Sequence, residues 1–478
     1  MKLDKIIEGL EVVKVIGKTD VEISEIKIDS GSVSDNCLFI CINGTVEDGH
    51  NYVKEAEYYG AKAVVVEKEV QTNLVQIIVK NTRIAMSKIA SNFYNNPSKD
   101  LKLIGVTGTN GKTTTTFIIK SILDSANIKC GVIGTLGAFW LDKKEELSLT
   151  TPDPLELHRL FYLMKKDGVS VVVMEVSAHA LDLHKVDNIY FDVSILTNVT
   201  QDHLDYFKNM QNYKLAKSKL FKKEMTRYSV INSDDSFGRK LIKELDFSVS
   251  YGLKNPSDIF AINVRQNNDK TSFVINLFDA VYNVKTSLIG EFNVYNVLAS
   301  ATACALIGVK VNDIILGINN TESVNGRLEK VYDKEIKIFI DYAHTPDGLK
   351  NSIKALKKNK KGRLICVFGC GGNRDKTKRP LMGEISGRYA DFTILTSDNP
   401  RFEEPMDIIF SVESGLCKKT KNYVIVENRK EAIKYAINYA RKGDVILIAG
   451  KGSEMYQEVF GIKHPFNDKD IIKQLVSV

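Results

Sequence analysis

The sequence has 478 residues but no apolar run near the roughly 18 residues that a membrane-spanning helix requires. Its amino-terminal stretch, MKLDKIIEGLEVVKVIGKTD, alternates apolar and charged residues and lacks the continuous apolar core of a secretory signal peptide. Internal repeats of short period and low-complexity segments are also missing. We therefore expect a cytoplasmic protein without stable membrane insertion.

Cysteine is scarce as well. The chain has seven cysteines, an odd number for a disulfide framework. Cys37 and Cys41 have the same spacing as Cys366 and Cys370, and both pairs lie in or beside apolar, strand-like runs. Neither pair has a histidine nearby at zinc-binding spacing. The pattern indicates core thiols in a reducing compartment.

The chain has little excess of either charge. It carries 66 basic and 59 acidic residues, for a net charge of +7. Basic clusters such as Lys357-Lys358-Asn359-Lys360-Lys361 contain no aromatic residues, which is typical of a solvated helix end rather than of a nucleic-acid surface. The mild positive balance suits small ligands that carry phosphates and carboxylates. We expect such partners and no nucleic acid.

Apolar runs of strand length alternate with amphipathic helical stretches along nearly the whole chain. The strand-like runs include AKAVVVE, VSVVVMEV, IKIFIDYA and DVILIAG, and the helical stretches include TTTTFIIKSILDSA and KEAIKYAINYARK. This alternation predicts an α/β fold with mostly parallel sheets. Breaks at NNPSKD and near Asn325-Gly326-Arg327 predict three domains, which span residues 1–99, 100–326 and 327–478.

A glycine-rich loop follows one strand and opens a helix in KLIGVTGTNGKTTTTFIIK. Backbone N–H groups at a helix start can cradle phosphate oxygens, Lys112 can neutralise the β- and γ-phosphates, and Thr113 can offer a hydroxyl to Mg²⁺. The loop departs from the strict nucleotide-binding pattern because Val106 stands where the first glycine belongs. The predicted ATP-binding residues of this loop are Gly108, Thr109, Asn110, Gly111, Lys112, Thr113 and Thr114.

Two further strand ends carry candidate metal ligands. The candidate ligand Glu175 ends the strand in VSVVVMEVSAHAL, and the candidate ligand His203 follows the strand in DVSILTNVTQDHLDYF. Asn198, in the same loop as His203, is a predicted ATP contact. A carboxylate at a strand end beside a phosphate loop can bind Mg²⁺, which prefers hard oxygen ligands. The alternatives are a solvated strand-end carboxylate and a structural histidine.

These segments resemble those of the Mur ligases. VTGTNGKTT is similar to the ATP loop of that family and of the related folylpolyglutamate synthetases, TN-x-x-x-DHLD resembles a Mur ligase signature, and the likeness covers almost the whole chain. The resemblance implies an amino-terminal α/β domain for a UDP-sugar, a central P-loop-type ATPase domain and a Rossmann-like carboxyl-terminal domain for an amino acid. It also implies that ATP phosphorylates a carboxylate, and that an amine then attacks the acyl phosphate.

By the same resemblance, four residues carry the chemistry: Lys112, Glu175, His203 and Lys217. The implied Mg²⁺ ligands are Thr113, Glu175, His203 and Lys217, the last as N6-carboxylysine. Carbamate formation needs a neutral amine, so Lys217 has to be buried. The segment NYKLAKSKLF alone reads as a solvated helix face, and the choice of Lys217 over Lys214 and Lys219 depends on the family motif.

Later segments resemble the family's ATP contacts. Asn293 and Asn296 lie in GEFNVYN, and their alternative role is helix N-capping. Arg327 ends the linker motif Asn325-Gly326-Arg327, in which Asn325 replaces the usual proline. The remaining implied contacts follow strands or lie in the loop GCGGNRDKTKRP. The alternative for this loop is a basic surface loop that binds no ATP. They are Asp341, His344, Asn373 and Arg374, with Lys378 in the same loop.

The segment SDNPRFEEP resembles the motif of the diaminopimelate-adding branch of the family. Arg401 can clamp the second carboxylate of meso-diaminopimelate, a group that lysine lacks. An ion pair of Arg401 with Glu403 or Glu404 is the alternative, and L-lysine is the rival substrate. The other implied amino-acid contacts are Arg379, Asp398, Asn399, Gly450 and Glu454, while Ser453 stands where the family usually has histidine.

The amino-terminal region resembles the UDP-binding domain of the same branch. Ser30 matches a uracil or pyrophosphate-side contact, although Gly31 replaces an arginine and Thr45-Val46 replace a polar pair. The implied contacts for the muramoyl dipeptide are Thr150, Thr151, Ser177 and Lys185, the last in place of an arginine.

The resemblance therefore implies a monomeric enzyme that takes ATP, Mg²⁺, a UDP-N-acetylmuramoyl dipeptide and meso-diaminopimelate. A folate-type ligase would leave the amino-terminal domain unexplained. A nucleotide-binding regulator without turnover remains the alternative of another class, and loss of Lys217 or His203 would be its sign, yet both are present.

Overall fold

The computed structural model describes residues 1–44, 47–267, 270–358 and 360–476. Thr45 and Val46, the replaced uridine-side pair, lie outside this part. By internal contacts the chain divides into two compact units. The first comprises Met1–Thr107, Ile128–Ser194 and Ala216–Tyr228, and the second comprises Gly108–Asn127, Ile195–Leu215 and Ser229–Val478.

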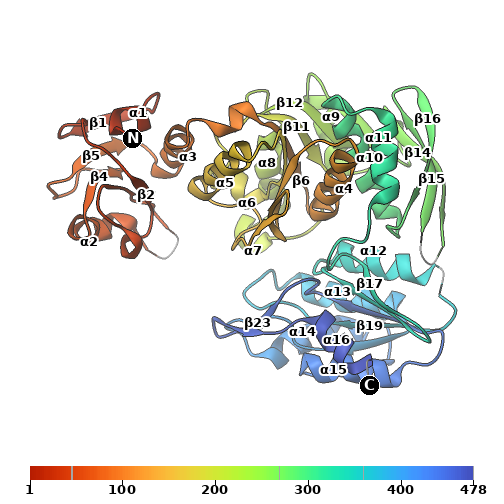
Figure 1. The fold of residues 1–478 in the computed structure, drawn as a ribbon. Coiled ribbons are helices and arrows are strands. Elements are labelled where there is room, and N and C mark those ends of the chain that lie inside the picture. The colour runs from red at the N-terminus through yellow and green to blue at the C-terminus, as the bar shows by residue number, and fades with distance from the viewer. Residues whose placement is uncertain (45–46, 268–269, 359, 477–478) are drawn as a thin grey trace. The chain divides into compact units, whose positions relative to one another are not determined.

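The first unit begins with a five-stranded sheet in the order β1-β5-β4-β3-β2, in which only the edge strand β1 is antiparallel to its neighbour (Figure 1). One face packs on α1 and α3 and the other on α2, because its buried strands are apolar on both sides. The elements are α1 (Leu3–Ile6), β1 (Val12–Ile16), β2 (Glu25–Lys27), β3 (Cys37–Ile40), α2 (Val53–Tyr58), β4 (Ala61–Val66), β5 (Val75–Val79) and α3 (Thr82–Phe93).

The rest of the first unit contains one end of an eleven-stranded sheet, in the order β6-β10-β7-β8-β9. Strand β10 is parallel to β6 and β7, all five of its residues are buried, and its last residue, Glu175, lies opposite Val106. The elements are β6 (Lys102–Thr107), β7 (Cys130–Gly134), β8 (Gly137–Trp140), β9 (Lys143–Glu145), α5 (Pro154–Lys166), β10 (Val171–Glu175) and α6 (Ala178–Asp182). Strands β11 (Phe191–Leu196) and β12 (Thr226–Asn232) and helix α8 (Met210–Ser218) have residues in both units.

The second unit contains the other end of that sheet, in the order β16-β15-β14-β13-β12. Helix α4 packs against α10 and α11, and the three helices lie side by side in Figure 1. The elements are α4 (Lys112–Ser125), α7 (Leu204–Phe207), α9 (Ser236–Glu244), β13 (Val249–Gly252), β14 (Ile259–Gln266), β15 (Thr271–Leu277), β16 (Ala280–Thr286), α10 (Glu291–Leu306) and α11 (Val311–Asn320).

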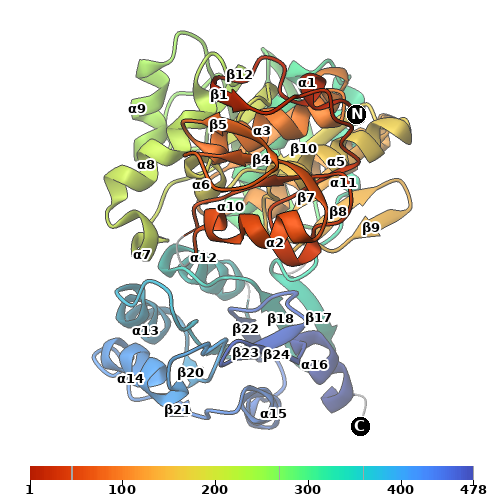
Figure 2. The same ribbon diagram turned by 90° about the vertical axis from the view of Figure 1, so that its left-hand side faces the viewer.

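The second unit ends with a six-stranded sheet in the order β17-β18-β22-β19-β20-β21, parallel except for β17. Helices α12, α13 and α14 cover one face, and α15 and α16 cover the other (Figure 2). The strands are β17 (Glu329–Asp333), β18 (Lys337–Asp341), β19 (Leu364–Phe368), β20 (Phe392–Leu395), β21 (Tyr423–Ile425), β22 (Val445–Ala449) and the hairpin β23 (Tyr456–Val459) and β24 (Ile462–Pro465). The helices are α12 (Pro346–Lys357), α13 (Lys378–Tyr389), α14 (Pro405–Leu416), α15 (Arg429–Tyr439) and α16 (Asp468–Val476).

The predicted α/β class with mostly parallel sheets is confirmed by this topology. All seven cysteines are free thiols and six are buried, as the sequence indicated. Within the described residues, no helix is both long and apolar enough to cross a membrane.

Candidate active site

The glycine loop between β6 and α4 has a conformation that requires glycine at two positions. Gly108 and Gly111 have φ values of +148° and +91°. A Cβ atom on Gly108 would lie 1.8 Å from Thr197 Oγ1, and one on Gly111 would lie 2.5 Å from Asn296 Oδ1. Neighbouring segments therefore close around the loop so tightly that side chains are excluded at these two points.

Asn198 fixes the same loop through its side-chain amide. Its Oδ1 accepts from Asn110 N–H at 3.0 Å, and its Nδ2 donates to the Asn110 carbonyl at 3.0 Å. Thr109 is held by the backbone of Asn198 and by Thr200. Asn198 thus positions the loop, a role that the sequence alone did not specify.

The predicted phosphate-binding side chains start α4. Lys112 Nζ donates to the carbonyls of Gly108 at 2.9 Å and Thr109 at 3.0 Å, so the ammonium folds back over the loop. Thr113 and Thr114 are buried. Arg327 Nη2 donates to Thr113 Oγ1 at 2.9 Å, and its guanidinium lies 4.2 Å from the Tyr342 ring centroid. Arg327, from a segment more than 200 residues away, therefore contacts the predicted Mg²⁺ ligand Thr113.

The alternative of N-capping for Asn293 and Asn296 is wrong, because the N-cap of α10 is Gly290. Both asparagines are buried inside the first turns of the helix. Asn296 Nδ2 donates to Asn293 Oδ1 at 3.0 Å, and Asn296 Oδ1 lies 3.5 Å from Thr115 Oγ1 of α4. Asn296 therefore contacts the helix that follows the phosphate loop, and Asn293 contacts Asn296.

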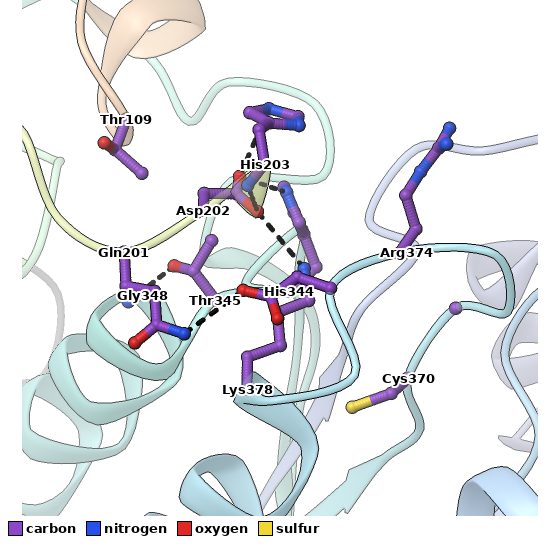
Figure 3. Close-up of polar contacts among 12 residues, drawn as sticks. Thr109, Gln201, Asp202, His203, His344, Thr345, Gly348, Cys370, Arg374 and Lys378 are labelled. Carbon is purple, nitrogen blue, oxygen red and sulfur yellow. Dashed lines mark hydrogen bonds and ion pairs between the residues drawn. The ribbon is translucent and has the colours of Figure 1, made fainter. Parts of the chain in front are cut away.

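Asp202 is the centre of a charged cluster that sequence reasoning missed (Figure 3). Its carboxylate lies 3.3 Å from His203 Nε2, 3.6 Å from His344 Nε2 and 3.3 Å from Lys378 Nζ. The side chain of Asp202 is only 5% exposed in this cluster of three basic groups. Its position inside the DHLD signature was the available signal.

The electrostatics of this cluster favour a charged Asp202. Burial raises the pKa of its carboxyl, but the polar contact with His344 and the charge of Lys378 outweigh burial and hold the pKa well below its usual range. Beside it, Gln201 Nε2 donates to Asp375 at 3.1 Å and to Thr377 at 2.8 Å. The segment 201–203 is therefore tied to the loop that begins α13.

Asp341 ends β18 and is almost completely enclosed. Its carboxylate accepts from Leu328 N–H at 2.6 Å, Ala343 N–H at 2.9 Å and Ser352 Oγ at 2.9 Å. Burial raises its pKa, although Arg327 acts in the opposite direction. The structure thus gives Asp341 a local role in shaping the strand end, and its predicted ATP contact stays a prediction.

The loop before α13 is clamped by Glu403. Arg379 donates two parallel hydrogen bonds of 3.0 Å to this carboxylate, and Asn373 N–H donates a third at 2.6 Å. The bond from Arg379 lowers the pKa of Glu403 to about 2. Arg374 is exposed nearby. Glu403 therefore pairs with Arg379 and not with Arg401 as the sequence alternative supposed.

Arg401 is held by other groups, in a left-handed backbone conformation with φ of +53°. Its Nε lies 3.1 Å from Glu458 Oε2, and its Nη1 donates to the Gly372 carbonyl at 2.8 Å. The guanidinium is thus positioned by two segments of the chain.

Lys451 is a second residue that sequence reasoning missed. Its ammonium is fully buried and donates to Asn399 Oδ1 at 2.9 Å and to Glu454 Oε2 at 2.8 Å. Asn399 Nδ2 also donates to Glu454, at 2.9 Å. Gly450 has φ of +111°, and a Cβ there would lie 2.4 Å from Asp398 Oδ2. Four predicted amino-acid contacts, Asp398, Asn399, Gly450 and Glu454, therefore gather at one place.

In the first unit, the end of β10 collects four predicted residues. Glu175 is buried and accepts from the Thr135 N–H at 2.9 Å and the Thr135 hydroxyl at 3.1 Å. Thr150 Oγ1 lies 3.2 Å from that hydroxyl. Thr151 Oγ1 donates to the Glu175 carbonyl at 2.9 Å and accepts from Ser177 N–H at 3.0 Å.

Burial distinguishes Lys217 from the lysines around it. Its side chain is 1% exposed, whereas Lys214 and Lys219 are half-buried and Lys219 pairs with Asp182 at 3.1 Å.

Two other predicted substrate contacts of the first unit are bound by nearby carboxylates. Lys185 is buried and pairs with Asp153 at 2.9 Å. Ser30 Oγ donates to Glu55 at 2.8 Å.

The predicted Mg²⁺ ligands come from both units: Glu175 and Lys217 from the first, Thr113 and His203 from the second. Within the described part of the chain, no group of three or more His, Cys, Asp or Glu side chains is placed to hold a metal ion. The predicted set is chemically different from such a group, since it combines one carboxylate, one imidazole, one hydroxyl and one carbamate.

Family models match three parts of this chain. The Mur ligase family catalytic domain matches residues 22–99, the Mur ligase middle domain matches 106–304, and the Mur ligase glutamate ligase domain matches 326–452.

Full-length relatives agree with these matches. The chain is 43% identical to UDP-N-acetylmuramoyl-L-alanyl-D-glutamate–2,6-diaminopimelate ligase of Caldanaerobacter subterraneus subsp. tengcongensis, over 100% of this chain and 99% of that protein. A solved structure of a ligase with the same name has a TM-score of 0.71 at 28% identity, covering 100% and 99% of the two chains. MurF ligase from Thermotoga maritima in complex with ADP shares the fold, with a TM-score of 0.65 at 21% identity over 94% and 96% of the chains.

Proposed function

Because this chain belongs to the Mur ligase family, we propose that it is the ATP-dependent ligase that joins meso-diaminopimelate to the D-glutamate of UDP-N-acetylmuramoyl-L-alanyl-D-glutamate in peptidoglycan synthesis. The observation that carries the proposal is the 43% identity, over the whole chain, to a relative named for this reaction. The domain boundaries that we propose remain 1–99, 100–326 and 327–478.

In the proposed reaction, the glutamyl carboxylate attacks the γ-phosphorus of ATP and ADP leaves. The amine of the amino acid then attacks the acyl phosphate, an amide bond forms and phosphate leaves. Negatively charged groups meet in the first step, so the site needs fixed cations and N–H donors. We assign this role to Lys112, the backbone of the loop from Gly108 to Thr114, and Arg327.

We assign Mg²⁺ to Thr113, Glu175, His203 and Lys217 as N6-carboxylysine. When bound, Mg²⁺ would neutralise charge on the phosphate oxygens. Two observations fit such a site. Glu175 is a buried carboxylate at the end of β10, and Lys217 is buried as carbamate formation requires. Asp202 would hold His203 by its Nε2 edge.

We assign the choice of amino acid to Arg401. A guanidinium can bind a carboxylate through two parallel hydrogen bonds, which favours meso-diaminopimelate over L-lysine. Its contacts with Glu458 and Gly372 support the assignment, since a specificity group has to be held in one orientation. The cluster of Asp398, Asn399 and Glu454 would receive the polar groups at the amino end.

Phosphate release separates this proposal from its rivals. The purified protein is given ATP, Mg²⁺ and the UDP-dipeptide, together with either meso-diaminopimelate or L-lysine. We expect release with diaminopimelate, and an amide product of the matching mass. Release with lysine alone would overturn the specificity, and no release with either amino acid would favour a nucleotide-binding regulator. An Arg401→Lys variant should lose most of its preference between the two amino acids.

The proposed substrates support a cytoplasmic location for the protein, because ATP and UDP-linked precursors are found in the cytoplasm. The free thiols fit a reducing compartment.

A further inference from the structure

A cavity of about 350 Å³ lies within the second unit, and none of the residues that line it is assigned a role above. One wall is formed by Gln266, Asn267 and Ile289. The other wall comes from the turn before β18, the segment after α12 and the loop before β22. Its volume lies in the range of small-molecule sites.

The cavity lies at the opposite end of the six-stranded sheet from the candidate active site. It is lined by Lys337, which begins β18, and Val445, which begins β22. Asp341 and Gly450 lie at or just after the carboxyl ends of the same two strands. A ligand in this cavity would therefore be separate from the predicted nucleotide and amino-acid contacts.

The floor of the cavity is the hydrophobic core itself. Ile289, Phe339, Ala355, Leu356 and Val445 line it, and all five belong to the cluster between the sheet and helices α12 to α14. Each remains 3–7% exposed. An apolar group that entered the cavity would bury this surface, and burial of apolar surface favours binding.

The rim is rich in lysine, with Lys334, Lys337, Lys360, Lys361 and Lys442 against Glu335 and Asp444. Several of these charges already have partners. Asp444 pairs with Arg363 at 2.7 Å, and Lys360 pairs with Asp391. Lys337 lies 3.4 Å from Asp333. Across the described residues, neither Lys334 nor Lys361 has an ion-pair partner. These two ammonium groups therefore remain available to an anion.

The walls are fixed before any ligand binds. Gly362 N–H donates to the Gly443 carbonyl at 2.9 Å, and Gly443 N–H donates to the Glu335 carbonyl at 2.7 Å. Across the cavity, Gln266 Nε2 donates to the Ala355 carbonyl at 2.9 Å. A preformed site loses little conformational entropy on binding.

We propose that this cavity is a second ligand site, which binds an organic anion consisting of an apolar body of aromatic-ring size and one carboxylate, sulfonate or phosphate group. The body packs on Phe339, Leu356 and Val445, and the anionic group lies between Lys334 and Lys361. The site does not depend on the ligase reaction.

The test measures binding of 8-anilinonaphthalene-1-sulfonate, an aromatic sulfonate, to the full-length protein by fluorescence titration. We expect one site per chain, and about tenfold weaker binding to the Lys334→Glu/Lys361→Glu double variant. The matched control is Lys358→Glu, an exposed lysine that does not line the cavity. Ala355→Leu, which fills the floor, should also weaken binding, and circular dichroism reports whether each variant is folded.

Competition experiments test whether the probe binds in this cavity rather than at the nucleotide site. ATP with Mg²⁺ should not displace the probe, and the uncharged analogue N-phenyl-1-naphthylamine should bind without sensitivity to the two lysines. Equal affinity of the wild type and the double variant, or displacement of the probe by ATP, would overturn the proposal.

Discussion

At the residue scale, Lys217 differs from its two neighbouring lysines in burial rather than in sequence. The three lysines in the ten-residue segment NYKLAKSKLF have the pattern of one solvated helix face, yet only Lys217 is enclosed. Asp202 shows the same effect for a carboxylate: its two histidine partners and Lys378 come from three separate parts of the chain. At both positions the neighbours in space decide the chemistry.

Replacing Lys217 tests its proposed carbamate. We expect Lys217→Ala to lower kcat for phosphate release at least about 100-fold, since a fixed charged group at the reacting centre is lost. Lys219→Ala, which removes only the partly exposed pair with Asp182, should keep nearly full activity. Full activity of Lys217→Ala would rule out the assigned role.

Replacing Asp202 tests its role as a positioning residue. Asp202→Asn keeps the shape but removes the charge that His203, His344 and Lys378 share, so we expect kcat/KM for ATP to fall about 10- to 100-fold. Asp202→Glu should recover part of this loss. The exposed Asp205 of the same signature supplies the control, Asp205→Asn. Steady-state kinetics at varied ATP would contradict the role if Asp202→Asn matched the control.

At the element scale, single side chains join loops that begin different helices. Glu403 ties the loop before α14 to the loop and first turn of α13 through Asn373 and Arg379. Asn296 joins α10 to α4 through its contact with Thr115, and Asn198 holds the phosphate loop through its bond with Asn110. These contacts set where the predicted binding residues lie, and none of them follows from helix or strand periodicity.

The Glu403 clamp gives a pH-dependent contribution to stability. Its pKa falls from 4.5 to about 2 in the fold, so the stabilisation is complete above about pH 5 and is lost as the pH falls toward 2. We expect Glu403→Gln to lower the free energy of unfolding more at pH 7 than at pH 4, as measured by urea denaturation. The exposed neighbour variant Glu404→Gln should show little change at either pH. An equal deficit of Glu403→Gln at both pH values would contradict the clamp.

At the scale of the whole molecule, three family models follow one another along the chain, while contacts divide it into two compact units. The first unit holds the predicted residues for the UDP-dipeptide together with Glu175 and Lys217. The second holds the predicted nucleotide and amino-acid residues. The proposed reaction therefore draws on both units.

A single chain supplies all of the assigned residues, so we expect a monomer. Light scattering coupled to size-exclusion chromatography should give one species of 53.5 kDa at micromolar concentration, with or without ATP. A stable mass of twice that value would contradict this expectation.

The sequence by itself determined the α/β class and the glycine loop between β6 and α4, because strand and helix periodicity and the glycine pattern of such a loop are properties of neighbouring residues. It also marked Arg401 and Lys217 through family motifs. Only the tertiary structure decided that Asp202 gathers three basic groups, that Glu403 pairs with Arg379, that Lys451 is buried, and that a lysine-rimmed cavity opens in the core. These features depend on distances between side chains far apart in the chain, and such distances are fixed by packing rather than by local pattern.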